Sequence, residues 1–168
     1  HENILLDLLK DKKKLPLFVS KYGNGINLAL KKLKKKHVNF IKKLDDNKEI
    51  VIDNLRFLLS HGSPWDANLY IYPNKFKNYI NEFNKYNYDF FLLGHTHIQM
   101  KKRIKNNIVL NPGSVGQPRD GDDLAKWAII DTKTRKIFFK KTKFNSNSLI
   151  KKIKKYDPEN KKLIKYYL

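Results

Sequence analysis

The chain has 168 residues, 40% hydrophobic and 31% charged, a composition typical of a folded globular domain rather than a disordered chain. The absence of cysteine excludes disulfides and thiolate metal sites, and no apolar run approaches the roughly 18 residues of a membrane span. The net charge of +20 favours anionic partners such as nucleic acid or phosphorylated ligands. Lysine runs also occur on helix faces that are merely solvated, so the charge alone selects no partner.

The first half of the chain is predicted to be mostly helical. A short helix covers 3–10, KYGNG at 21–25 forms a turn, and apolar residues at helical spacing predict a second helix over 26–44. Residues 49–53 and 55–60 read as a hairpin, which runs into the loop HGSPWDAN. A further helix is expected over 74–84, with Asn74 as its N-cap.

The second half is predicted to contain most of the sheet. The continuous apolar run at 88–93 predicts a buried strand, and a strand at 107–110 leads into the loop NPGSVGQPRDGDD. Segments 127–131 and 137–143 predict a second hairpin. From Ser146 onward we expect two short amphipathic helices, the second starting at Pro158. Since no repeat or linker interrupts this order, residues 1–168 are expected to form one α/β domain.

Histidines follow two of the predicted strands. The runs LRFLLS-HGSP, YDFFLL-GHTH and NNIVL-NPGSVG each pass from a strand into a loop of small and polar residues, where α/β sheets bind ligands. His95 and His97 are one residue apart, so an extended backbone would direct both rings to one side, and His61 is expected to converge on them. Neutral imidazole ligates Zn, Fe, Mn or Ni ions, so this spacing predicts a metal site.

Each histidine also has a purely structural interpretation. A lone histidine at a strand end, such as His61, is often a hydrogen-bonded structural residue, whereas the His-x-His pair favours ligation. His37 lies among lysines and is expected to be an ordinary surface residue.

The loops together resemble a known family. GHTH (94–97), HGSP (61–64) and NPGSVGQPRD (111–120) are similar to motifs of the calcineurin-like metallophosphoesterases, with the small prokaryotic phosphodiesterases as the nearest branch. The resemblance covers essentially the whole chain. It implies an α/β fold built as a mixed β-sandwich flanked by helices in an αββα arrangement. It also implies that residues 1–168 are the C-terminal two-thirds of one such domain, because the family's Asp-x-His and Gly-Asp motifs would precede His1.

The resemblance also implies roles for individual residues. His61 and His95 would ligate one divalent ion and His97 another, while His1 would be the catalytic histidine that stabilises or protonates the leaving oxygen. The two ions (Mn, Fe, Zn, Ni or Mg) would clamp a phosphate and generate a bridging hydroxide. Since the missing motifs would complete both metal shells, the isolated chain is expected to be inactive.

Substrate contacts are predicted in the last loop. Arg119 could hold a phosphate oxygen in bidentate fashion, or form an ion pair with Asp120 or Asp122. Trp65 and Tyr70 are expected either to pack or to face a nucleobase.

The favoured function is metal-dependent hydrolysis of phosphomonoesters or phosphodiesters, with a small phosphoester or nucleotide as substrate and no membrane partner. The alternatives are a basic nucleic-acid-binding module with structural histidines, and a non-catalytic scaffold. The lack of cysteine and of an apolar leader favours a cytoplasmic location.

Overall fold

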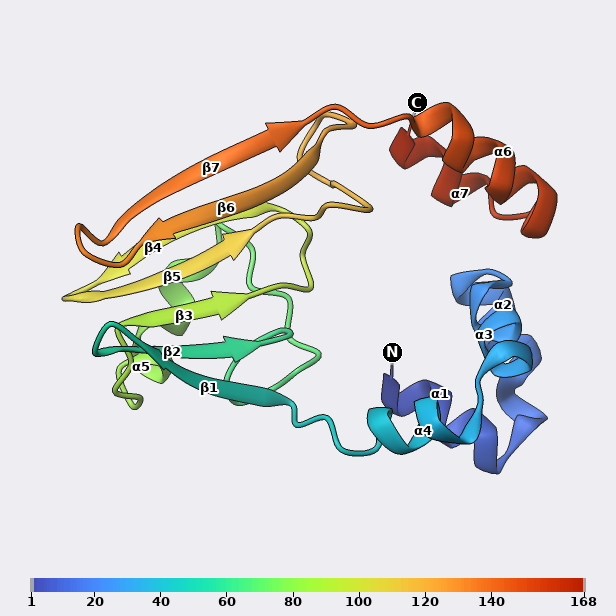
Figure 1. Ribbon diagram of the computed structural model, residues 1–168, viewed down its shortest axis with the longest axis horizontal. Coiled ribbons are helices and arrows are strands. Elements are labelled where there is room, and N and C mark those ends of the chain that lie inside the picture. Colours follow the sequence, from blue (N-terminus) through green and yellow to red (C-terminus); the bar gives the residue numbers. More distant parts are fainter. Residues whose placement is uncertain (1, 168) are drawn as a thin grey trace. The chain divides into compact units, whose positions relative to one another are not determined.

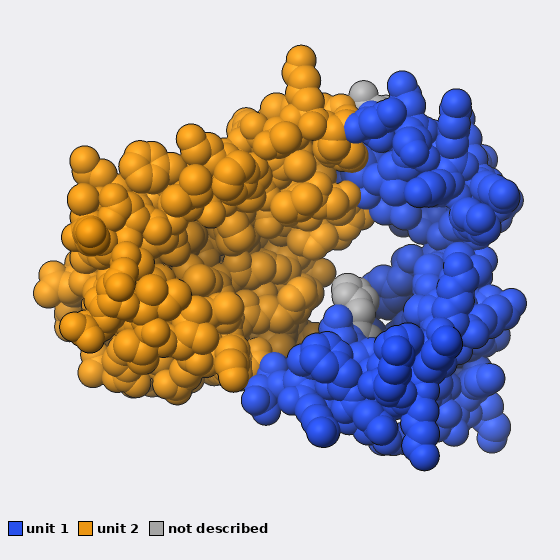
Figure 2. Space-filling view, in the orientation of Figure 1, with its two compact units in different colours: residues 1–45, 145–168 blue, residues 46–144 orange. Residues whose placement is uncertain are grey.

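The computed structural model describes residues 2–167 (Figure 1). Two compact units are present (Figure 2). The first, called here the helical unit, comprises residues 1–45 and 145–168, and the second, the sandwich unit, comprises residues 46–144. Among residues 2–167, no helix combines the length and apolar character needed to cross a bilayer.

The helical unit joins segments from both ends of the chain. Backbone and side-chain nitrogens of Asn24 donate to the Asp157 carboxylate and the Tyr156 carbonyl, each at 2.9 Å. Within the described part of the unit, the buried apolar residues are Leu5, Leu8, Ile150, Ile153 and Tyr167. Its elements are α1 (Glu2–Lys10), η1 (Lys12–Lys14), α2 (Leu15–Tyr22), α3 (Gly25–Lys32), α4 (Lys35–Ile41), α6 (Ser146–Tyr156), α7 (Lys161–Ile164) and η3 (Lys165–Tyr167).

Several predicted helix boundaries in this unit are wrong. The helix expected over 26–44 is two helices, because Leu33 is extended (φ −69°, ψ 126°) between α3 and α4. Five lysines crowd residues 31–36, and like charges at helical spacing repel one another, which disfavours a continuous helix there. The last helix begins at Lys161 rather than Pro158, since the Asn160 side chain accepts from the Leu163 amide and caps it. Helix α2, with Pro16 in its first turn, was not predicted.

The sandwich unit is built on a mixed five-stranded sheet, ordered β1-β2-β3-β5-β4. Strands β2, β3 and β5 are mutually parallel, and β1 and β4 pair antiparallel at the two edges. The central strand buries Phe90 and Phe91 completely, which explains its continuous apolar sequence. The strands are β1 (Asn47–Ile52), β2 (Leu55–Ser60), β3 (Phe90–Leu93), β4 (Gln99–Ile104) and β5 (Asn107–Pro112).

A second sheet and a helical segment cover the two faces of the first sheet. The hairpin of β6 (Ala125–Asp131) and β7 (Lys136–Thr142) packs Ile130 and Ile137 against the cluster of Phe57, Phe90 and Ile108. On the other face, Phe76 and Phe83 of η2 (Phe76–Tyr79) and α5 (Ile80–Phe83) join Phe91 in a larger cluster. Burying each such aromatic ring stabilises the fold by roughly 1.5–3 kcal/mol. The prediction of a mixed α/β sandwich flanked by helices is confirmed.

The helix expected over 74–84 is shorter than predicted. It is a 3-10 turn followed by one α-helical turn, and the residue at its start is Lys75 without a side-chain cap, so the assignment of Asn74 as the cap is wrong. Strand β4 was not predicted, because QMKKRI buries only Met100 and Ile104 and is otherwise polar.

Candidate metal centre

The parallel strands bring two histidines together. His61 directly follows β2, and His95 follows β3 after one glycine. The register pairs Ser60 with Leu93, and the Gly94 amide donates to the His61 carbonyl at 2.9 Å. As a result, Nε2 of His61 lies 2.8 Å from Nδ1 of His95.

Gly94 lets the two loops approach closely. A Cβ atom at Gly94 would lie 3.3 Å from the His61 carbonyl oxygen, which is tighter than an ordinary van der Waals contact. The glycine between β3 and His95 therefore belongs to the contact between the two histidine loops.

The backbone of the GHTH loop is not extended. His95 and His97 both have left-handed conformations, with φ of 62° and 60°. The expectation that an extended segment would direct both rings to one side is therefore wrong. Such conformations cost roughly 1–3 kcal/mol each in non-glycine residues and are concentrated at functional sites.

A buried asparagine compensates for this local cost. The Nδ2 atom of Asn111, on β5, donates to the Gly94 carbonyl at 2.6 Å and to the Thr96 hydroxyl at 3.0 Å. The Asn111 side-chain oxygen accepts from the Gly113 amide at 3.0 Å. Asn111 and Thr96 are almost completely buried, so these bonds hold the GHTH loop against the third strand end.

Backbone carbonyls orient the two rings. Nε2 of His95 lies 3.1 Å from the Asn68 carbonyl, and Nδ1 of His97 lies 2.8 Å from the Gln117 carbonyl. A carbonyl oxygen can only accept, so the nitrogen facing it carries the proton. In the neutral rings the lone pair then sits on Nδ1 of His95 and Nε2 of His97. A ring nitrogen that donates to a backbone carbonyl while the other keeps its lone pair is the usual arrangement of a metal-ligating histidine.

The surroundings favour the neutral form of both rings. Burial lowers the pKa of His95, nearby positive charge on His61, His97 and Arg119 lowers it further, and the Asn68 hydrogen bond opposes the shift. Burial likewise lowers the pKa of His97, assisted by Arg119 and His61 and opposed by the Gln117 bond. Since only neutral imidazole ligates a metal, both shifts favour metal binding near neutral pH.

Arg119 lies in the loop that holds His97. Its backbone amide donates to the His97 carbonyl at 3.2 Å, and its guanidinium donates to the Gln117 side-chain oxygen at 3.2 Å. The side chain is exposed.

The neighbouring carboxylates of this loop pair with lysines. Asp120 and Asp122 both contact the buried Lys126, and Asp122 also contacts Lys141 at 2.7 Å. Burial by itself would lower the pKa of Lys126, but the hydrogen bonds to Asp120 and Asp122 outweigh it and the pKa is raised. Lys126 is therefore a buried, charged lysine that holds the loop through its ion pairs with Asp120 and Asp122.

The donor set fits a divalent cation in kind but not in number. Nε2 of His61 and Nδ1 of His95 lie within hydrogen-bonding distance of each other, and the tautomer of His97 leaves the lone pair on its Nε2. Imidazole nitrogens are the donor type that a borderline metal ion prefers. Within residues 2–167, however, no group of three or more His, Cys, Asp or Glu side chains lies close enough to hold one ion.

The chain has two further histidines, His1 and His37. His1 lies outside the described residues. His37 is exposed, as expected for a surface residue, and its Nδ1 accepts the Lys34 amide at 3.1 Å at the start of α4.

The two aromatic candidates, Trp65 and Tyr70, have different surroundings in the structure. Trp65 packs against the core, with its ring 5.0 Å from that of Phe83 in an edge contact. Tyr70 lies over His95, with ring centroids 3.7 Å apart, and keeps 40% of its surface exposed. Sequence reasoning missed Asn68, Gln117 and Asn111 as orienting residues. The first two act through backbone carbonyls, which leave no side-chain signal, whereas Asn111 stands in the recognised NPGSVG motif.

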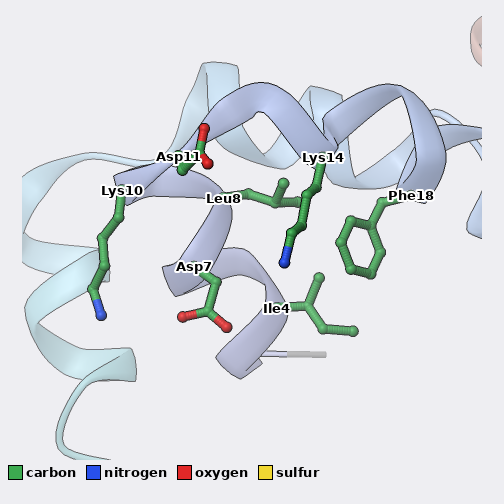
Figure 3. A pocket seen from close by; sticks show the side chains of 7 residues that line it. All are labelled: Ile4, Asp7, Leu8, Lys10, Asp11, Lys14 and Phe18. Atoms are coloured by element: carbon green, nitrogen blue, oxygen red, sulfur yellow. The ribbon is translucent and has the colours of Figure 1, made fainter.

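A pocket lies in the helical unit, and none of its described lining residues is a histidine. It encloses about 310 Å³ and is lined by apolar, acidic and basic side chains; Figure 3 shows Lys14 reaching between Leu8 and Phe18. The lining residues are Ile4, Asp7, Leu8, Lys10, Asp11, Lys14 and Phe18.

Comparison with known proteins shows which family and fold this chain is similar to. Residues 18–135 match the model of the calcineurin-like phosphoesterase superfamily domain. An uncharacterized protein of Methanocaldococcus jannaschii is 30% identical over 154 residues, covering 82% of this chain and 62% of that protein. A hypothetical protein from Pyrococcus horikoshii OT3 has a similar structure, with TM-score 0.74 and 18% identity over 90% of this chain and 64% of its own.

A second solved structure has a similar fold. A metallophosphoesterase from Sphaerobacter thermophilus superposes with TM-score 0.72 and 20% identity, covering 89% of this chain and 66% of its own. These structural likenesses establish the fold. The chain thus spans between 62% and 66% of the length of these relatives.

Proposed function

Because this chain belongs to the calcineurin-like phosphoesterase superfamily, we propose that it takes part in metal-dependent hydrolysis of phosphoester bonds, in small phosphodiesters, phosphomonoesters or nucleotides. The observation that carries the proposal is the pair of ring nitrogens of His61 and His95, 2.8 Å apart, at the carboxyl ends of adjacent parallel strands. Ligands bind at this edge in α/β sheets.

The ring orientations of His95 and His97 support the ligand assignment that the resemblance implies. His61 and His95 would hold one divalent ion, of the Mn, Fe, Zn, Ni or Mg type, and His97 would hold a second through Nε2. The carbonyls of Asn68 and Gln117 support this assignment, because each fixes a ring by accepting its other N–H.

The chain's own residues would do the remaining work on the substrate. Divalent cations, when bound, supply the charge that polarises a phosphoryl group and lowers the pKa of a coordinated water. Arg119 would bind a phosphoryl oxygen, since its exposed guanidinium extends from the loop that holds His97. His1 would donate a proton to the leaving oxygen, in keeping with the resemblance at the start of the chain.

Residues 1–168 alone are expected to hydrolyse phosphoesters slowly or not at all. Among the described residues no third His, Cys, Asp or Glu joins His61 and His95 around one ion. The remaining donors are expected from the part of the domain that the longer relatives have in addition. Turnover of bis-p-nitrophenyl phosphate by residues 1–168 at an ordinary enzymatic rate of about 1 per second or more would contradict this expectation.

Metal binding tests the ligand assignment without requiring turnover. In NMR spectra of the histidine rings, substoichiometric Mn²⁺ should broaden the signals of His61, His95 and His97 first. His37, exposed in the helical unit, provides an internal control. Equal broadening of His37, or none at the strand-end histidines, would refute the assignment.

A matched pair of variants tests the same assignment by calorimetry. His97→Gln should weaken Mn²⁺ or Zn²⁺ binding by at least about tenfold, whereas His37→Gln should leave it unchanged. Both variants should keep the wild-type far-UV spectrum. Equal effects of the two substitutions would refute the assignment of His97 as a metal ligand.

A further inference from the structure

The positive charge is concentrated in the helical unit. Its 69 residues contain 19 lysines and six acidic residues, so it carries +13 of the chain's +20. The 99 residues of the sandwich unit carry the remaining +7. A compositional bias acting evenly along the chain would not produce this difference in charge density.

The lysines of the helical unit are available to a partner. All 19 are exposed. The ion pairs formed within residues 2–167 join side chains of the sandwich unit, where Glu49, Glu82, Asp89, Asp120 and Asp122 neutralise lysines and arginines. The helical unit's lysines take no part in these pairs, so an incoming anion would not have to displace a protein carboxylate.

Helix α6 shows how the charge is arranged. Ile150 and Ile153 are buried on one side, and Lys151, Lys152, Lys154 and Lys155 are exposed. Lysines three or four residues apart on a helix lie about 5–6 Å from one another and repel. A polyanion with closely spaced charges relieves this repulsion and releases its own counterions.

Exposed aromatic rings lie next to lysines in α6 and in α2. Tyr156 is 50% exposed with the Lys155 ammonium 5.3 Å from its ring centre, and Tyr22 is 43% exposed with Lys21 at 5.1 Å. Unpaired bases stack on exposed aromatic rings next to basic side chains. An amphipathic helix that inserts into a membrane needs a free apolar face, but the isoleucines of α6 are already buried.

We propose that the lysine-rich surface of the helical unit, centred on α6, binds single-stranded nucleic acid through its phosphates and bases. Figure 2 shows the unit, in blue, from one side. This binding function goes beyond the proposed hydrolysis. It requires no metal, so it can fail or hold independently of the metal centre.

Fluorescence anisotropy with labelled oligonucleotides of about 20 nucleotides, in EDTA and with NaCl varied between 50 and 300 mM, tests the proposal. Oligo-dT and oligo-rU arms distinguish DNA from RNA. Each phosphate neutralised contributes about −0.7 to the slope of log K against log salt for single strands. The variant K151Q/K152Q/K154Q/K155Q should therefore bind at least tenfold more weakly and reduce the magnitude of the slope by about 2 to 3.

A control variant in the sandwich unit removes the same number of positive charges. K48Q/K101Q/K133Q/K136Q removes four exposed lysines and should keep the wild-type affinity and slope within about twofold. Equal losses in the two quadruple variants would overturn the proposal, since net charge alone would then explain binding. Stronger binding to phosphatidylserine vesicles than to either oligonucleotide would also overturn it.

A single substitution separates base stacking from charge. Tyr156→Leu keeps every lysine and should weaken oligonucleotide binding by about tenfold with an unchanged salt slope. An unchanged affinity would overturn the stacking part of the proposal. This variant also serves if the quadruple variant fails to fold, as judged by far-UV circular dichroism.

Discussion

Two left-handed histidines on either side of a buried threonine define the candidate centre at the scale of single residues. His95 and His97 have φ near +60°, and Thr96 between them is 2% exposed. Such a conformation persists only where its surroundings fix it. Asn111 does this with three hydrogen bonds, so the geometry of the GHTH loop depends on a residue of another strand.

Replacing this asparagine should therefore be costly. Asn111→Ala removes one of the two hydrogen bonds that the Gly94 carbonyl and the Thr96 hydroxyl each accept, and the bond that the Gly113 amide donates. We expect the free energy of unfolding to fall by about 2–4 kcal/mol. Urea denaturation measures the change. The control Asn78→Ala removes an exposed side chain of the same unit and should change stability by less than about 0.5 kcal/mol. A loss as small as the control's would contradict the role given to Asn111.

The ion pairs around Lys126 predict a pH dependence. The bonds from Lys141 and Lys126 lower the pKa of Asp122 to about 2, below its usual value of 3.8. A carboxylate with a depressed folded-state pKa stabilises the fold above its unfolded pKa and loses that contribution as pH falls through the folded value. The stability difference between wild type and Asp122→Asn should be largest above pH 4 and shrink as pH falls from 3.8 towards 2.

Urea unfolding at a series of pH values measures this difference. Asp123→Asn removes an adjacent exposed carboxylate and provides the matched control. A wild-type advantage over Asp122→Asn that stays constant from pH 5 down to pH 2 would contradict the assignment of the ion pairs.

At the scale of elements, parallel strand ends and tight loops place the donors. Strands β2 and β3 end in register at Ser60 and Leu93, so the histidines that follow them meet. Gly62 lets the first loop fold back, because a Cβ atom there would lie 2.6 Å from the Ala67 carbonyl oxygen and 2.8 Å from that of Leu69. This loop also carries the Asn68 carbonyl that orients His95.

Gly62→Ala should accordingly disturb the loop. The added methyl group meets backbone that cannot move independently, and we expect a loss of about 1–3 kcal/mol in the free energy of unfolding. Thermal and urea unfolding give the magnitude. Gly116→Ala, where a methyl group meets open space, should be nearly neutral. The idea of a close approach at Gly62 would be wrong if both alanines were equally well tolerated.

Elements were predictable from the sequence where their own residues show a clear apolar pattern. The apolar run of β3 and the two hairpins were recognised because a buried or half-buried strand shows in its own residues. Strand β4 escaped notice because a polar edge strand depends on pairing with β5 rather than on its own apolar pattern. The break between α3 and α4 was missed because the apolar spacing continues through it. Repulsion among the neighbouring lysines, which disfavours one continuous helix, does not show in that spacing.

At the scale of the whole molecule, the two units differ in the size of their cores. The sandwich unit buries Phe90, Phe91, Ile108 and Val109 completely. Among its described residues the helical unit buries five apolar side chains, and most of the others are at least partly exposed. Local stability follows buried apolar contact, so the two units are expected to open at different free energies.

Hydrogen exchange of the intact chain measures this difference. Amides of β3 and β5 should be protected longest, whereas those of α2, α3 and α4 should exchange earliest, by at least about tenfold in rate. Uniform protection across both units would instead favour the single cooperative domain that the sequence predicts for residues 1–168.

The sequence by itself determined the mixed α/β class, the order of the histidine loops and the family, because strand patterns and motif residues are local properties of the chain. Only the tertiary structure decided which ring nitrogens face backbone carbonyls, which carbonyls these are, and that Asn111 and Lys126 fix the loops. It also decided that positive charge from both ends of the chain gathers in one unit. The physical reason is that these features arise from contacts between segments distant in sequence, several of them through backbone atoms that every residue shares.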